Sequence, residues 1–228
     1  MTITLYDLAG AGDERFSPYC WRARMALAHK GLDVVTSPVN FVDIAKIADG
    51  QFPTVPVLDD NGMRLHDSFA IAQYLEKTYP DTPSLFGGGQ GVNYARFIQA
   101  WANSVLHPEI VRMLVVDIHD RLTAEDQEYF RKSREKRFGK TLEQVQEGRK
   151  ERREDFRSRL TPVRLMLASQ PFLCGDEPGF ADYILFGTLQ WAAISSDFKL
   201  LKETDPINQW YDRCLDLHGG IGRAGLAE

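Results

Sequence analysis

Ser17 stands directly before Pro18, where the sequence predicts the start of a helix. Serine is a favourable N-cap, and proline suits the first helical turn because its missing N–H costs nothing there. The free N–H groups and the partial positive potential at a helix N-terminus stabilise an anion. A serine hydroxyl in this place could also donate a hydrogen bond to a thiolate. Such a site would lower the pKa of a bound thiol and supply a nucleophile at neutral pH.

Two further pairs of residues could hold the rest of such a thiol compound. Val55-Pro56 opens a predicted strand, and a proline there cannot donate to the ladder. A cis peptide bond would turn the N–H and C=O of Val55 outward, toward an extended peptide; the sequence alone leaves the isomer open. Asp67-Ser68 begins another predicted helix. Its N-terminus and the Ser68 hydroxyl suit a carboxylate, while Asp67 suits an ammonium group.

Short strand-like and helix-like segments alternate around these residues in the first part of the chain. β-Branched and aromatic residues predict a strand at 2–6, and the spacing of Ala23, Ala26 and Leu27 predicts a helix that ends at Gly31. Further strands are expected at 34–36, 55–58 and 64–65, and a helix at 67–79. This β-α-β and β-β-α order is that of an α/β thioredoxin-like domain, which we assign to residues 1–81.

Strand signals vanish beyond a Pro- and Gly-rich stretch at 82–91, which is typical of an interdomain linker. Phe97, Trp101 and Val105 recur at helical spacing, which is typical of core residues, and Pro108 is expected to interrupt that helix. Further helices are expected at 144–167, 181–195 and 206–217. The sequence therefore predicts an all-helical second domain at residues 92–228.

Composition narrows the class of protein. Of the 228 residues, 43% are hydrophobic and 26% are charged, which is ordinary for a soluble globular chain. No apolar run is long enough to cross a bilayer, and the first residues lack the pattern of a secretory signal. Three scattered cysteines without a histidine cluster favour a reducing cytoplasm and no metal site. The net charge of −5 argues against nucleic acid as the main partner.

Residues 131–159 form the most basic stretch, with twelve Lys or Arg against six Asp or Glu. A nucleic-acid interface is one interpretation of this excess. The favoured interpretation is a solvated helix laced with opposite charges, because aromatic residues are not interleaved and the whole chain is acidic. The excess could still attract an anionic substrate or partner.

The motifs resemble those of the cytosolic glutathione transferases over nearly the whole chain. The matching segments are Ser17-Pro18-Tyr19-Cys20-Trp21-Arg22 with residues 26–27, then 55–58, 67–71, 172–175 and 181–183. The chain departs from the family at Gly179, where serine or threonine is usual. Asp182 would then lie in the first helical turn and accept a hydrogen bond from the N-cap backbone. The reciprocal hydrogen bond, to an N-cap side chain, would be missing. Ser17-Pro18-Tyr19-Cys20 also resembles the Cys-Pro-Tyr-Cys of glutaredoxins, with serine replacing the nucleophile and Cys20 expected to be a buried small residue.

The resemblance implies a homodimer with glutathione as co-substrate. Ser17 would stabilise the thiolate, Val55 would pair with the cysteinyl backbone, and Thr54 would contact the glycyl end. Asp67 and Ser68 would hold the γ-glutamyl group. A hydrophobic, aromatic electrophile would lie between the domains, and the candidate residues of its pocket are Phe16, Tyr19 and Trp101.

Within the family, residues 3–8, 133–135 and 142–149 are most similar to those of bacterial β-etherases and fungal etherase-related transferases. Residues 122–149 resemble their insertion in the second domain. Those enzymes use the glutathione thiolate to displace an aryl oxide from a β-aryl ether. The alternative is a protein that binds glutathione or another ligand without turnover, as a carrier or scaffold, since one fold hosts many functions.

Overall fold

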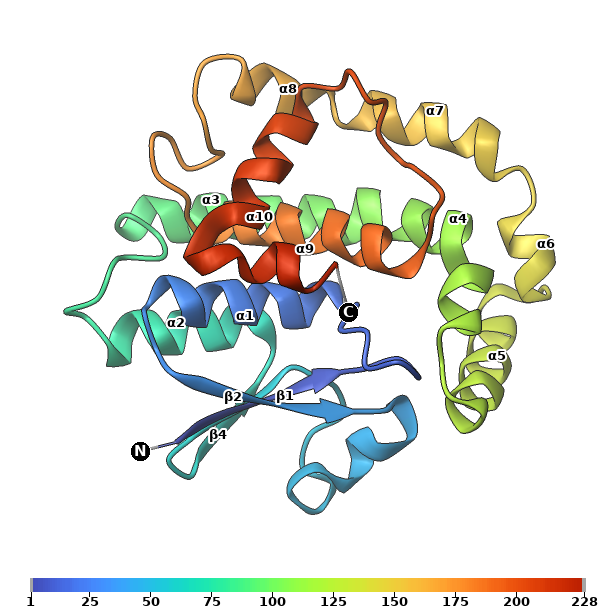
Figure 1. The fold of residues 1–228 in the computed structure, drawn as a ribbon, viewed down its shortest axis with the longest axis horizontal. Coiled ribbons are helices and arrows are strands. Elements are labelled where there is room, and N and C mark those ends of the chain that lie inside the picture. Colours follow the sequence, from blue (N-terminus) through green and yellow to red (C-terminus); the bar gives the residue numbers. More distant parts are fainter. Residues whose placement is uncertain (1, 227–228) are drawn as a thin grey trace.

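The computed structural model describes residues 2–226 and begins with a four-stranded sheet. Its strands are β1 (Ile3–Leu8), β2 (Val34–Val39), β3 (Val57–Asp60) and β4 (Met63–His66). They lie in the order β2-β1-β3-β4, with β2 parallel to β1 and the other two pairs antiparallel. Helices α1 (Pro18–His29) and α2 (Ser68–Thr78) lie between the sheet and the helical part (Figure 1). The predicted thioredoxin-like arrangement is confirmed.

The remaining chain is helical, as expected. Between β2 and β3, helical turns at η1 (Phe41–Gly50) pack beside the second part of the chain. That part contains α3 (Gly89–Trp101), η2 (Ala102–Leu106), α4 (His107–Asp120), α5 (Ala124–Phe138), α6 (Leu142–Gln146), α7 (Arg149–Arg159), α8 (Thr161–Leu167), α9 (Phe180–Ser195) and α10 (Ile207–Ala224). Among residues 2–226, no helix has the length and apolar character that a bilayer crossing requires.

Several boundaries differ from the sequence-based expectation. The helix after the linker already begins at Gly89 and continues past Pro108 to Asp120. In a regular α-helix the ring of Pro108 would clash with the preceding turn. At that position the chain forms a π-helical turn, Ala102–Leu106, which accommodates the ring. The single helix expected at 144–167 is divided into three, because Gly148 adopts a left-handed φ of 73° and Leu160 leaves the helical region. Phe97, expected in the core, is 67% exposed.

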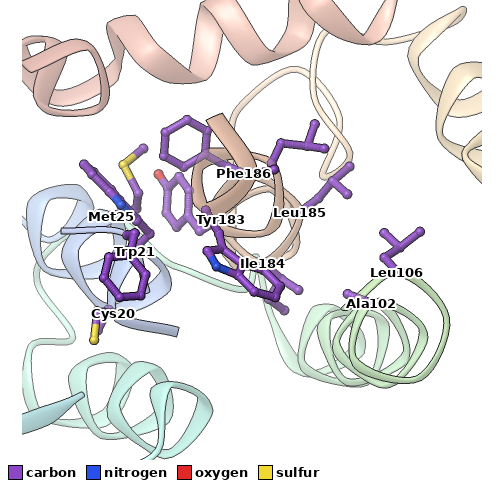
Figure 2. Close-up of a cluster of buried hydrophobic side chains, with 14 of the residues drawn as sticks. Cys20, Trp21, Met25, Ala102, Leu106, Tyr183, Ile184, Leu185 and Phe186 are labelled. Carbon is purple, nitrogen blue, oxygen red and sulfur yellow. The ribbon is translucent and has the colours of Figure 1, made fainter. Parts of the chain in front are cut away.

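Helix α1 is held in place by a close approach to α9. A Cβ atom on Gly187 would lie 2.4 Å from the carbonyl oxygen of Pro18, so only glycine lets the two backbones come this near. Trp21 and Met25 of α1 face Tyr183 and Phe186 of α9 in a buried cluster (Figure 2). The ring centroids of Trp21 and Phe186 lie 5.9 Å apart, edge to face. The second part of the chain therefore fixes the helix that Ser17 caps.

Asp182 confirms the expected contact at the start of α9. Its buried carboxylate accepts hydrogen bonds from the N–H groups of Gly179, Leu173 and Cys174, and from the indole of Trp210. A Cβ atom at Gly179 would lie 2.7 Å from Sγ of Cys174. The same Cβ atom would lie 3.1 Å from the carbonyl oxygen of Leu85, so the family's usual serine or threonine would be crowded here.

Candidate functional site

Ser17 is the N-cap of α1, as the sequence predicts. Its backbone is extended, and its Oγ accepts a hydrogen bond from the N–H of Cys20 at 3.3 Å. The residue is buried in the protein but contributes to the wall of a cleft. A hydroxyl can accept and donate at once, so Ser17 can still donate to an anion in the cleft.

Cys20 lies one turn further along α1 and is completely buried. Burial, followed by the nearby charge of Asp7, raises the pKa of the Cys20 thiol well above its ordinary value. A protonated, inaccessible thiol is a poor nucleophile. The likeness to a glutaredoxin motif therefore does not extend to thiol exchange, and Cys20 acts as a small core residue.

The Val55–Pro56 peptide bond is cis. Thr54, Val55 and Pro56 all line the same cleft as Ser17. The paired register of β3 begins only at Val57, opposite Tyr6, so Val55 stands before the ladder. Its peptide groups are thus at the cleft wall, where an extended backbone could pair with them.

Asp67 is the N-cap of α2 and adopts an unusual backbone conformation, with φ at 73°. Its Oδ1 accepts hydrogen bonds from the N–H groups of Phe69 and Ala70, both at 2.9 Å. A non-glycine residue in this region costs on the order of 1–3 kcal/mol, and such residues cluster at functional sites. Asp67 and buried Ser68 both line the cleft. One carboxylate oxygen thus caps the helix, and among residues 2–226 no hydrogen bond reaches the other.

The cleft has a volume of about 920 Å³ and collects most of the predicted site. Its walls include seven of the eight candidate residues: Phe16, Ser17, Tyr19, Thr54, Val55, Asp67 and Ser68. Trp101 is not among the lining residues. It ends α3 and packs, half-buried, against the hydrophobic core. The indole at the cleft is that of Trp191, on α9.

The other half of the cleft is built from residues that sequence reasoning did not select. They come from η1, α4, α5 and α9, and include Phe41, His107, Phe130, Arg134, Arg137 and Trp191. Phe16, next to Ser17, contacts Phe41 with ring centroids 6.4 Å apart, and Phe41 contacts Phe130 at 5.8 Å. A continuous aromatic wall therefore leads from Ser17 toward α5.

His107 is the most connected of these missed residues. Its Nδ1 lies 3.3 Å from the Tyr19 hydroxyl, and its Nε2 lies 3.0 Å from Oγ1 of Thr188 and 3.3 Å from Nη2 of Arg22. Burial, and then the charge of Arg22, lower the pKa of His107 to about 3. Burial also lowers the pKa of Arg22, to about 10. At neutral pH the imidazole is therefore neutral and the guanidinium is charged.

These contacts select one tautomer of His107. A guanidinium can only donate, so Nε2 of His107 must accept from Arg22, and the ring proton lies on Nδ1. The hydroxyl of Thr188 adjusts to this by rotation, donating either to Nε2 or to the carbonyl oxygen of Ile184, 2.9 Å away. Nδ1 then donates to the oxygen of Tyr19. The Tyr19 O–H is left to donate into the cleft, where the side chain is 38% exposed.

Comparison with known families identifies both parts of the chain. Residues 13–83 match the family model described as the glutathione S-transferase N-terminal domain, and residues 93–215 match that of the C-terminal domain. The chain belongs to the glutathione S-transferase family. Glutathione is therefore the co-substrate of this transferase, and the likeness supports glutathione-dependent transferase function.

Individual relatives are similar over most of the transferase chain. A glutathione S-transferase-like protein, ustS of Aspergillus flavus, is 29% identical over 75% of this chain and 72% of its own. The crystal structure of GSTFuA3 from Phanerochaete chrysosporium is 30% identical and superposes with a TM-score of 0.76, over 100% of this chain and 95% of its own. A Ceriporiopsis subvermispora transferase, solved in complex with glutathione, is 26% identical with the same TM-score, over 100% and 96%.

The donor set of this transferase suits its co-substrate. Two helix N-termini, a serine hydroxyl and the carboxylate of Asp67 surround the same half of the cleft. They offer donors to a thiolate and to a carboxylate, and an acceptor to an ammonium group. A second hollow, of about 390 Å³, is lined by residues of α4, α6 and α7 together with Phe138 and Lys140, and contains none of the predicted site residues.

Proposed function

We propose that this protein is a glutathione transferase in which Ser17 stabilises the thiolate of bound glutathione for attack on a hydrophobic aromatic electrophile. The observation that supports this most strongly is that Ser17, Val55 and the Asp67-Ser68 pair line one cleft. In this proposal residues 1–81 hold glutathione, and residues 92–228 supply the wall that receives the electrophile.

Glutathione would lie extended between the two helix N-termini. The α-ammonium of its γ-glutamyl group would pair with Asp67, and the α-carboxylate would meet Ser68 and the N-terminus of α2. The cysteinyl backbone would pair with the peptide groups of Val55, with Thr54 at the glycyl end. This placement directs the sulfur to Ser17 at the N-terminus of α1, where the hydroxyl and the helix potential favour the thiolate.

The chemical step is a substitution at carbon. The thiol proton leaves to solvent, the sulfur forms a bond to the electrophilic carbon, and the bond to the leaving group breaks with both electrons going to that group. An aryl oxide would leave in the etherase-type reaction and take up a proton. The aromatic wall, together with the sequence likeness to β-etherases, favours an aromatic acceptor and makes β-aryl ethers the first compounds to test.

The proposal is tested on the thiol itself. In Ser17→Ala, the pKa of glutathione in the binary complex should rise, and turnover of an aryl halide should fall about 100-fold, as when one preorganised donor is removed. Cys214→Ala is the matched control, because it removes a buried thiol on α10, outside the lining of the cleft. Unchanged turnover in Ser17→Ala would remove Ser17 from the mechanism and leave the Tyr19 O–H or a backbone N–H as the donor. Retention on immobilised glutathione without turnover of any electrophile would indicate a carrier.

We also infer a homodimer. Phe97 is 67% exposed on α3, an unusual position for a large aromatic side chain, and Met63 is 57% exposed on edge strand β4. Burial of such side chains between two subunits would stabilise the pair. Sedimentation of the wild type should show a dimer, and Phe97→Asp should shift it to monomer. Leu165→Asp, at an equally exposed position on α8, should not; monomeric wild type would contradict the inference.

A reducing cytoplasm is the compartment we infer. The three cysteines, Cys20, Cys174 and Cys214, are free thiols, and two of them are buried. Such a chain needs no oxidising environment to fold. A fluorescent fusion expressed in the native cell would test this, and accumulation outside the cytoplasm would contradict it.

A further inference from the structure

Two arginines on one face of α5 line the cleft beyond its aromatic wall. Arg134 and Arg137 are three residues apart, so their side chains emerge on the same side of the helix. Both belong to the walls of the cleft that also contains Ser17. The guanidinium of Arg134 stacks over Phe130 at 4.6 Å and lies 5.8 Å from the ring of Phe41.

This arginine pair differs from most of the other arginines in residues 131–159, which have a carboxylate partner within 4.0 Å. Arg131 pairs with Glu135 and Glu143, Arg149 with Asp117, and Arg157 with Glu154, at 2.6–3.0 Å. Within the part of the chain that the structure describes, neither Arg134 nor Arg137 has a carboxylate within 4.0 Å. The Arg134 guanidinium donates a hydrogen bond to the neutral hydroxyl of Ser133, at 3.0 Å.

The environment of Arg134 is unfavourable for a cation without a partner. Burial lowers the pKa of Arg134, and the charge of Arg137 lowers it further, so the two guanidiniums are close enough to repel each other. A desolvated charge is costly unless it is paired. An anion between the two arginines would relieve both the desolvation and the repulsion.

Helix α5 is held firmly enough to present this pair. Asp126, completely buried in its first turn, accepts hydrogen bonds from the N–H groups of Phe41 at 2.9 Å and Val42 at 3.0 Å. The contact ties α5 to η1, the segment beside it in Figure 1. The ring of Phe41 therefore keeps its place between Phe16 and Phe130.

We propose that Arg134 and Arg137 bind an acidic group, a carboxylate or sulfonate, on the aromatic electrophile. The proposal rests on the proposed transferase function and narrows its substrate class to aromatic acids. The aromatic ring would lie along Phe41 and Phe130 with its reactive carbon toward Ser17, and its acidic group would reach α5. The glycyl carboxylate of glutathione is a second acidic group that could bind the same two arginines. The experiment distinguishes between the two groups.

The test measures binding, not turnover. Calorimetry compares S-(4-carboxybenzyl)glutathione with the neutral S-(4-carbamoylbenzyl)glutathione, which has a similar shape. The wild type should bind the acid about tenfold more tightly, and this preference should shrink as salt is added. The double variant R134Q/R137Q should lose the preference. K132Q/K136Q, which removes two exposed charges from elsewhere on the same helix, should keep it.

Each outcome decides the assignment. Equal affinity of the two conjugates in the wild type, or a preference that survives in R134Q/R137Q, would overturn it. A tenfold loss of affinity for glutathione itself in R134Q/R137Q would show that the two arginines bind the glycyl carboxylate. That result would also overturn the assignment. Because conjugates bind without reacting, a preference in a protein that turns over no electrophile would support the arginine site while contradicting the transferase. The salt dependence uses the unaltered protein, so it remains informative if the double variant fails to fold.

Discussion

The two halves of the cleft are built in different ways. In the glutathione half, Ser17 and Asp67 each cap the helix that follows them, and Val55 stands one residue before a cis proline. Each of these positions is set by its neighbours in sequence. In the acceptor half, the wall is assembled from η1, α4, α5 and α9, far apart in the chain. Local chain geometry thus forms the half proposed to bind glutathione, and tertiary packing forms the half proposed to receive the acceptor.

Their electrostatics differ as well. The carboxylate in the cleft wall, Asp67, belongs to the glutathione half, whereas the wall of the acceptor half contains Arg112, Arg134 and Arg137. Arg112 is paired with Glu109 at 3.1 Å, which leaves the pair on α5 as the cations available to a ligand. We therefore expect a change in one half to alter the binding of one substrate and to leave the binding of the other nearly unchanged.

The largest difference between the effects on the two substrates is expected from Asp67→Ala. The variant removes the cap of two N–H groups and leaves a ligand ammonium without a partner, a loss of on the order of 2–5 kcal/mol when such a pair is broken. KM for glutathione should rise about 100-fold, with KM for the acceptor unchanged, in steady-state assays at varied glutathione. Asp67→Asn, which keeps an acceptor oxygen for the cap, should show a smaller rise. Equal rises in both KM values would contradict the division of the cleft.

Asp126→Ala should act on the opposite half. Without the carboxylate, the N–H groups of Phe41 and Val42 lose their acceptor, so α5 loosens against η1. Two lost hydrogen bonds should lower the free energy of unfolding by about 2 kcal/mol, measured by urea denaturation. KM for the aromatic acceptor should rise about tenfold while KM for glutathione stays constant. Thr123→Ala, which removes the N-cap of the same helix, controls for helix stability alone. Matching effects from both variants would mean that the contact with η1 is not specific.

The same difference explains what could be predicted from the sequence. The N-caps at Ser17 and Asp67 and the proline after Val55 were predicted because such features have short-range signatures, and the thioredoxin-like order was confirmed for the same reason. The acceptor side was only partly found. Trp101 was a candidate there because the family resemblance places the first helix of the second domain opposite the thiol, but helical spacing does not say which face of α3 meets the cleft. Trp191 occupies the wall instead.

His107 shows why the rest was beyond sequence reasoning. Its partners Arg22 and Thr188 lie 85 and 81 residues away along the chain, and no spacing rule connects them. Pro108 indicated a disturbance of this helix, but not that it would take the form of a π-helical turn at Ala102–Leu106 within a continuous helix. The ion pairs of residues 131–159 were expected as a set, yet which arginines lack a partner depends on packing. Tertiary contacts therefore determine which residues line this half of the cleft, and its charge.

Tyr19→Phe offers the smallest and sharpest test, because Tyr19 stands where the two halves meet. The Nδ1–H of His107 donates to the Tyr19 oxygen, which leaves the Tyr19 O–H to donate to a departing oxyanion. Loss of one such hydrogen bond, worth about 0.5–1.5 kcal/mol, should lower kcat about fivefold for an aryl oxide leaving group. For an aryl chloride, whose leaving group needs no proton, kcat should stay within about twofold, and the pKa of bound glutathione should not move. Because the pKa of His107 is lowered to about 3, the effect should be constant from about pH 5 to 8. An equal loss with both leaving groups and a raised thiol pKa would place Tyr19 with Ser17 in the glutathione half.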